Sequence, residues 1–175
     1  MEDSIQVVDY DANWSIRFEQ EKSQILNALG DAVLDIQHIG STSVPGLAAK
    51  PIIDILVGVE ELPPSPTYIK ALETLGYVYQ GEAGIPGRHF FRKGMPRTHH
   101  LHLVKLGNEV WENQLLFRNF LQHHPDKAKQ YEALKRKLAV QFRLDREGYV
   151  QAKAPLIEQM LSDAMAWSKP CEASE

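Results

Sequence analysis

The chain has 175 residues, of which 43% are hydrophobic and 24% are charged, and its formal net charge is -4 at pH 7. This composition fits one globular domain and excludes a disordered or fibrous chain. The negative charge argues against broad, nonspecific binding to nucleic acid, which depends on neutralising phosphates, although a local basic site stays open.

No apolar run approaches the roughly 18 residues of a membrane helix, and the N-terminus lacks the basic flank and apolar core of a signal peptide. We therefore expect a cytoplasmic protein with no membrane partner. The only cysteine, Cys171, lies in a polar tail, so neither an internal disulfide nor a thiolate zinc site is expected. We place a single domain at residues 1–167 and a flexible tail at residues 168–175.

Hydrophobic periodicity predicts alternating helical and extended elements in the first part of the chain. Apolar residues on one helical face from Trp14 to Leu29 predict an amphipathic helix that ends at Gly30. Short β-branched or aromatic runs bounded by turn residues predict five strands, at residues 32–39, 52–59, 77–80, 88–92 and 99–104. A short helix is expected between the second and third strands, at residues 67–75.

From Asn108 onward the pattern is helical, with one segment to His124, a second begun by Pro125 and a third over residues 148–167. The charged stretch KAKQYEALKRK, residues 127–137, is expected to form a solvated helix face. The elements together predict an α+β fold, in which helices flank a mixed β-sheet and a helical segment closes the chain.

A Gly-Ser turn follows the first strand and carries three consecutive hydroxyls. The residues are Gly40, Ser41, Thr42 and Ser43, and the next strand carries Asp54 among aliphatic residues. Glycine lets the backbone approach a ligand closely, and hydroxyls donate to phosphate oxygens. A carboxylate on the adjacent strand can hold the magnesium that accompanies a polyphosphate. The alternative is an ordinary loop followed by a hydrogen-bonded strand aspartate.

Lys50 immediately precedes the Asp54 strand, where its ammonium group could reach the same phosphates as the Ser41 turn. A second basic segment runs from residue 86 to residue 105 and contains five Lys or Arg, four His and no acid. On a regular strand Arg88 and Arg92 share one face, which suits a phosphorylated ligand. The alternative for this segment is a solvated basic edge that deters strand pairing.

His100 and His102 lie two residues apart, so both project from the same face of the predicted fifth strand. Such a pair can bind a transition metal, contact phosphate or transfer protons. The alternative is a pair of exposed strand histidines without a role.

The string IGSTSVPGLAAKPIIDI, residues 39–55, resembles the motif of the GrpB-like branch of the nucleotidyltransferase superfamily. The later blocks THHLHLV, WENQLLFRNFLQHHP and YEALKRKLA are also similar to that branch, so the resemblance extends over about residues 5–160. It implies a nucleotidyltransferase-like fold. It also implies a divalent metal, Mg²⁺ or another, at Asp54. From the chemistry of the side chains we expect Asp54 and His102 to be the catalytic residues, with His100 or His102 as metal ligand or proton carrier.

Active members of the superfamily resemble one another in carrying a second acidic residue two positions after the first, where this chain has Leu56. Two-metal chemistry needs a further ligand, for which Glu82, His100 and His102 are the candidates. The leading hypothesis is a protein that binds a nucleotide or other phosphorylated small molecule and transfers a nucleotidyl group. The alternatives are an inactive nucleotide-binding helper in CoA-type cofactor metabolism and a metal-dependent phosphohydrolase.

Overall fold

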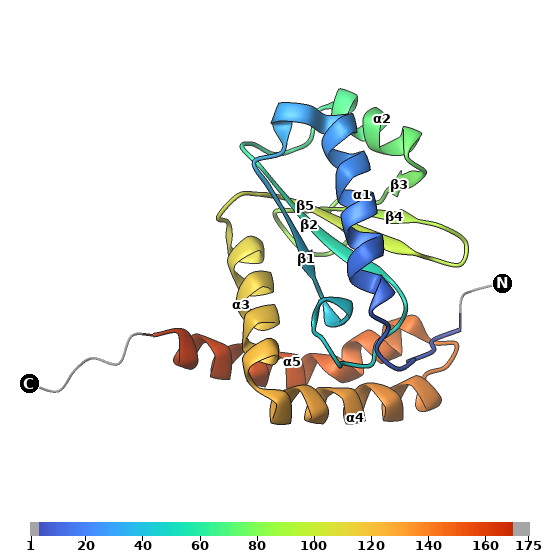
Figure 1. Cartoon of the computed structure of the whole chain (residues 1–175), viewed down its shortest axis with the longest axis vertical. Helices are drawn as coiled ribbons and strands as arrows, with labels where there is room; N and C mark the ends of the chain where they lie inside the picture. The colour runs from blue at the N-terminus through green and yellow to red at the C-terminus, as the bar shows by residue number, and fades with distance from the viewer. Residues whose placement is uncertain (1–3, 170–175) are drawn as a thin grey trace, which may run out of the picture.

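The computed structural model describes residues 4–169, which form a five-stranded mixed sheet with helices around it (Figure 1). The strands are β1 (Asp35–Ile39), β2 (Ile53–Val59), β3 (Tyr77–Tyr79), β4 (Arg88–Lys93) and β5 (His99–Lys105). The helices are α1 (Asn13–Leu29), α2 (Pro66–Thr74), α3 (Glu109–His123), α4 (Pro125–Gln141) and α5 (Arg146–Ser168). Two short 3-10 turns complete the elements, η1 (Gly30–Ala32) and η2 (Ser41–Ser43).

The strand order is β1-β2-β5-β4-β3, with β2 and β5 parallel and the other neighbours antiparallel. The central β2 and β5 are almost fully buried, because helices or loops cover both faces of the sheet there. The α+β prediction is confirmed, including the mixed sheet and the helical C-terminal part.

One face of the sheet carries the main core and is covered by α1 and α2. Residues of β2 and β5 with odd numbers, from Ile53 to Leu103, pack there against Trp14 and Ile25 of α1 and Leu72 of α2. Figure 1 shows α1 crossing in front of the strands. This burial supplies the hydrophobic driving force for the fold.

The opposite face carries the even-numbered residues of β2 and β5 and is covered in two parts. Trp111 of α3 packs on Leu56 and Val104 in the upper part. Below the strands, α4 and α5 form a layer whose contacts with α3 make a second core (Figure 1). The polar residues at the lower ends of the strands therefore face the layer of α4 and α5.

Three expectations about the elements need correction. The first strand begins at Asp35 instead of residue 32, because residues 30–32 form a turn closed by the bond from Val33 N to Gly30 O. The last helix continues to Ser168, so its final residue lies in the predicted tail. Lys135 is only 2% exposed, so the stretch 127–137 is not a wholly solvated face.

Cys171 lies outside the described residues, as does most of the tail. None of the helices within residues 4–169 combines the length and the apolar character needed to cross a bilayer.

Candidate functional site

The Gly-Ser turn lies directly against Asp54. β1 and β2 are antiparallel, and Ile39 at the end of β1 is opposite Asp54, so the following Gly40 passes over the carboxylate. Gly40 has φ 72° and ψ -174°, a conformation that residues with a side chain rarely adopt. A β-carbon at Gly40 would lie 2.6 Å from Asp54 Oδ2, so glycine is required both for the turn and for the close approach.

The three hydroxyls of the turn have different surroundings. Thr42 is buried, and its Oγ1 lies 3.0 Å from His38 Nε2 and donates to Ile52 O. Ser43 Oγ donates to Gly40 O at 2.5 Å. Ser41 lies near Tyr131 of α4, where it acts to lower the pKa of that phenol. Thr42 and Ser43 thus stabilise the turn itself, whereas Ser41 faces α4.

Asp54 contacts two histidines of β5, His100 and His102. The parallel register places Asp54 beside His100, and His102 follows on the same face. Asp54 Oδ1 lies 3.4 Å from His100 Nδ1 and 3.2 Å from His102 Nε2. Burial acts to raise the pKa of Asp54, but hydrogen bonds from His100 and His102 outweigh it and hold this pKa far below its usual range. Asp54 is therefore ionised at neutral pH.

The outer nitrogens of the two histidines have no partner among the described residues. His100 Nε2 and His102 Nδ1 are both buried. Phe90 of β4 covers them, with ring centroids 5.0 Å and 5.4 Å from those of His100 and His102. Burial also lowers the pKa of His100, against the opposing effect of Asp54. The carboxylate thus orients two imidazoles whose other ring nitrogens are buried.

Two lysines approach Asp54 from the side of α5. Lys50 and Lys153 lie over the Tyr149 ring, with Nζ atoms 5.0 Å and 4.5 Å from its centroid. Burial, with the repulsion of neighbouring cations, lowers the pKa of Lys50 to about 7 and that of Lys153 to about 8. The negative charge of Asp54 opposes both shifts, because it favours the charged form of each amine.

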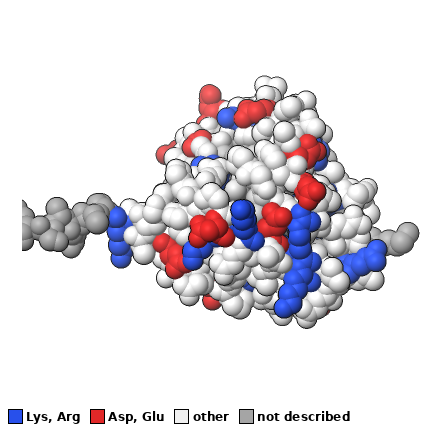
Figure 2. Space-filling view, turned by 60° about the horizontal axis from the view of Figure 1, so that its bottom comes forward, with Lys and Arg blue, Asp and Glu red and all other residues white. Residues whose placement is uncertain are grey.

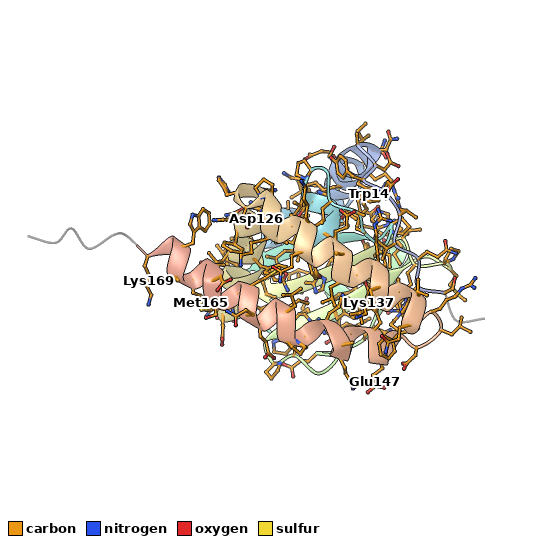
Figure 3. The ribbon with its side chains drawn as sticks, turned by 90° about the horizontal axis from the view of Figure 1, so that it is seen from below. Trp14, Asp126, Lys137, Glu147, Met165 and Lys169 are labelled. Atoms are coloured by element: carbon orange, nitrogen blue, oxygen red, sulfur yellow. The ribbon has the colours of Figure 1, made fainter. Side chains whose placement is uncertain are left out.

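A third lysine comes from α4. Lys135 Nζ donates to Ala48 O at 2.5 Å and lies 4.6 Å from the centroid of the Tyr131 ring. Burial and the charge of Lys153 lower its pKa to about 7. The view from below shows α4 and α5 lying across this end of the sheet, with side chains of both helices between them and the strands (Figure 3). We name the group Asp54, His100, His102, Lys50, Lys135 and Lys153 the Asp54 site.

The arginines of the predicted basic strand, β4, are less closely tied to the Asp54 site than the lysines are. Arg88 and Arg92 face the same side as His102 and His100, as expected from their alternation along β4. Arg88 Nη2, however, donates to Glu82 O and Ala83 O, so this guanidinium also supports the loop that precedes its strand. The Glu82 carboxylate accepts the Gly87 N–H in the same loop.

Comparison with known proteins identifies the chain. The family model described as GrpB protein matches residues 4–163. The chain belongs to the GrpB family. GrpB is a member of the nucleotidyltransferase-like superfamily, so the predicted membership is confirmed. The crystal structure of conserved protein GrpB from Enterococcus faecalis is similar, with a TM-score of 0.87 and 38% identity over 93% of this chain and 98% of that chain.

Two longer proteins contain a region similar to this GrpB chain. The UPF0157 protein YqkA of Bacillus subtilis is 39% identical over 94% of this chain, which spans only 48% of YqkA. A dephospho-CoA kinase of Mycolicibacterium paratuberculosis is 26% identical over 94% of this chain and 47% of its own length. The chain thus spans about half the length of these two relatives.

At the position of the second acidic residue of the superfamily, this GrpB chain has a buried apolar residue, Leu56. Leu56 is fully buried and contacts Ile39, Val104 and Trp111 below α3. Its position on the same face as Asp54 agrees with the strand alternation. A carboxylate there would have to displace the α3 contacts.

The donors around Asp54 do not fit a preformed divalent metal centre. Both histidines point at one oxygen of a single carboxylate, and Glu82 is bonded within its own loop. Among residues 4–169, no group of three or more His, Cys, Asp and Glu is arranged to hold a metal ion. Binding of Mg²⁺ or another divalent metal stays a prediction.

Sequence reasoning missed the lysines of the two long helices. Lys135 and Lys153 each follow a tyrosine by four residues, Tyr131 and Tyr149, which places each pair on one helix face. This repeated Tyr-x-x-x-Lys spacing was a signal for two similar amine positions. Which part of the sheet they reach depends on how α4 and α5 dock.

Proposed function

We propose that this GrpB-family chain binds a nucleotide or another phosphorylated small molecule at the Asp54 site. The observation that carries the proposal is a cluster of three amines beside Asp54: the charge of Asp54 acts on Lys50 and Lys153, and the charges of Lys50 and Lys153 both act on Lys135. Their lowered pKa values mean that the fold disfavours their charged forms. Phosphate oxygens would remove this penalty by pairing with the ammonium groups.

The surroundings of the three amines suit a ligand with several phosphate oxygens. Lys50 and Lys153 share the Tyr149 ring, and their Nζ atoms lie 5.0 Å and 4.5 Å from its centroid. Lys135 lies over the Tyr131 ring, and Ser41 of the turn lies close enough to act on the pKa of this tyrosine. Amines from the loop before β2, from α4 and from α5 would therefore reach one ligand together.

We favour binding without two-metal nucleotidyl transfer. That reaction needs a second carboxylate beside Asp54, and Leu56 is packed below Trp111 at that position. The second candidate is acid–base chemistry by His102, which the hydrogen-bond contact of 3.2 Å between its Nε2 and Asp54 Oδ1 favours. An ionised carboxylate orients an imidazole and stabilises its protonated form, which is the arrangement of a general base.

The similarity to a dephospho-CoA kinase supports a helper role in cofactor metabolism. A region like this chain accounts for 47% of that relative, so ligands of that kinase are the first to test. Dephospho-CoA and ATP both combine an adenine nucleotide with phosphates, the ligand class that the Asp54 site suits.

Calorimetric titration of the full chain with ATP, dephospho-CoA, AMP and pyrophosphate, with and without Mg²⁺, tests the proposal. Lys153→Met should weaken binding at least tenfold, because it removes an ammonium group from the Asp54 site. Lys137→Met is the matched control, since this lysine lies on the exposed face of α4 and is labelled in Figure 3. Absence of binding by any of the four ligands, or equal effects of the two variants, would overturn the proposal.

A further inference from the structure

A pocket of about 430 Å³ lies next to the Asp54 site, at the amino-terminal ends of β2 and β5. Its walls come from the N-terminal segment, α1, the segment before β2, the β4–β5 turn and the first residue of α5. We call it the Arg17 pocket. Its volume falls in the range of about 300–1,000 Å³ that is typical of small-molecule sites.

The lining of the Arg17 pocket is strongly basic. Arg17, Lys50, Arg97 and Arg146 line it, and none of the lining residues in the described part of the chain is acidic. Within residues 4–169, neither Arg17 nor Arg146 takes part in a salt bridge. On the lower surface, by contrast, Lys and Arg lie among Asp and Glu (Figure 2).

The convergence of Arg17, Lys50 and Arg146 is unfavourable without an anion. They come from segments far apart in the sequence, so the tertiary fold brings like charges together, and like charges at close range repel. Lys50 shows the effect: burial and the repulsion of neighbouring cations, Arg146 and Arg97 among them, together lower its pKa to about 7. Bound oxyanions would neutralise this local charge.

The remaining lining residues indicate the kind of anion. Guanidinium groups present paired N–H donors that match the two oxygens of a carboxylate or phosphate group. Pro51, Ile52 and Pro96 form an apolar part of the wall, which suits a carbon skeleton. The pocket is therefore better matched to an organic acid or phosphate ester than to a bare metal ion or an apolar ligand.

We propose that the Arg17 pocket is a second binding site, beside the Asp54 site and sharing Lys50 with it, for a small organic oxyanion, either a carboxylate or a phosphate ester. This inference does not rest on the proposed function, because Arg17 and the β4–β5 turn are not part of the Asp54 site. Lys50 belongs to both sites, so occupation of one is expected to change the affinity of the other.

The test is a titration of the ¹⁵N-labelled full chain in phosphate-free buffer at constant ionic strength. The probes are glycerol 3-phosphate, succinate and citrate, and the expected result is saturable shifts of the Gln6 and Thr98 amide signals. Arg17→Met and Arg146→Met should each weaken binding at least tenfold. Arg143→Met, which removes an exposed cation near the start of α5, should leave affinity within twofold. Tighter binding of either probe class identifies the chemistry of the ligand.

Two readouts separate the second site from the proposed function and from a purely structural role of Arg17. Shifts at Gly40 and Ser41 report on the Asp54 site, so their absence, with shifts at Gln6 and Thr98 retained, would count against the proposed function alone. Arg17→Lys keeps the charge and should retain more affinity than Arg17→Met, which a purely structural role of Arg17 would not produce. Lack of saturable binding by all three probes, or wild-type affinity in a folded Arg17→Met variant, would overturn the second site.

Discussion

The α-carbon of Gly40 lies so close to Asp54 that a β-carbon there would be 2.6 Å from Oδ2. The turn that follows β1 and the Asp54 carboxylate of β2 are therefore in such close contact that a shift of either one would require the other to move. Substitution at this contact should affect both stability and ligand binding.

Gly40→Ala should destabilise the fold by about 2–4 kcal/mol, because it combines backbone strain at positive φ with a steric clash. Gly46→Ala is the matched control, since Gly46 also has positive φ, 81°, but has nothing within 4 Å of an added β-carbon. It should cost only about 1–2 kcal/mol for the backbone conformation. Urea unfolding measures the free energy of unfolding of both variants. Equal losses would contradict the prediction, because they would show that the added β-carbon at position 40 causes no costly clash with Asp54.

Asp54→Asn should destabilise the protein at neutral pH, by about 1–3 kcal/mol, because it removes the charge that both histidines contact. The folded-state pKa of Asp54 is far below its ordinary value, so the stabilisation is present above the unfolded pKa of about 3.9 and is lost as pH falls toward the folded value. The stability difference between wild type and Asp54→Asn should thus shrink below pH 4. Glu158→Gln, an exposed acid on α5, controls for the general loss of charge.

Stability of the ligand-free protein should rise between pH 7 and pH 9.5. Lys50, Lys135 and Lys153 have folded-state pKa values of about 7, 7 and 8, below the unfolded value of about 10.4, so the unfolded chain binds more protons in this range. Lys135→Met should flatten the rise in urea unfolding experiments, whereas Lys137→Met should not. A wild-type curve that falls over this range would show that the amines are not held in a charge-disfavouring environment.

Affinity for sulfate, whose charge is constant above pH 3, should fall over the same pH range. Binding at the Asp54 site needs protonated amines, so the affinity should decrease as Lys50 and Lys153 lose their protons. Calorimetry in two buffers of different ionisation enthalpy should also detect proton uptake near pH 8. Binding that is equally tight at pH 7 and pH 9.5 would argue that other groups hold the anion.

Leu56→Asp should destabilise the fold by at least about 3 kcal/mol, because an acid would be buried among Ile39, Val104 and Trp111. Leu56→Met, which nearly conserves volume, should cost less than about 1.5 kcal/mol.

Manganese titration of the wild type, Leu56→Asp, Glu82→Gln and His102→Ala tests the predicted metal. A folded Leu56→Asp variant with higher Mn²⁺ affinity than the wild type would restore the two-carboxylate mechanism to consideration.

The strand alternation and the Gly-Ser motif, both local features, were sufficient to predict which residues lie beside Asp54. A period of two places His100 and His102 on one face of β5, and the GrpB-like string around Asp54 predicted the family and the fold class. Such patterns report which residues share a face within one element, because side-chain direction follows backbone conformation.

The tertiary structure decided which elements meet at that face. The stretch containing Lys135 has the composition of a solvated helix, and only the docking of α4 buries this lysine against Ala48. In the same way, α3 buries Leu56 and the fold gathers Arg17, Lys50 and Arg146 around one pocket. Contacts between residues so far apart depend on how helices and strands pack over long sequence separations, which the local period of any one segment does not encode.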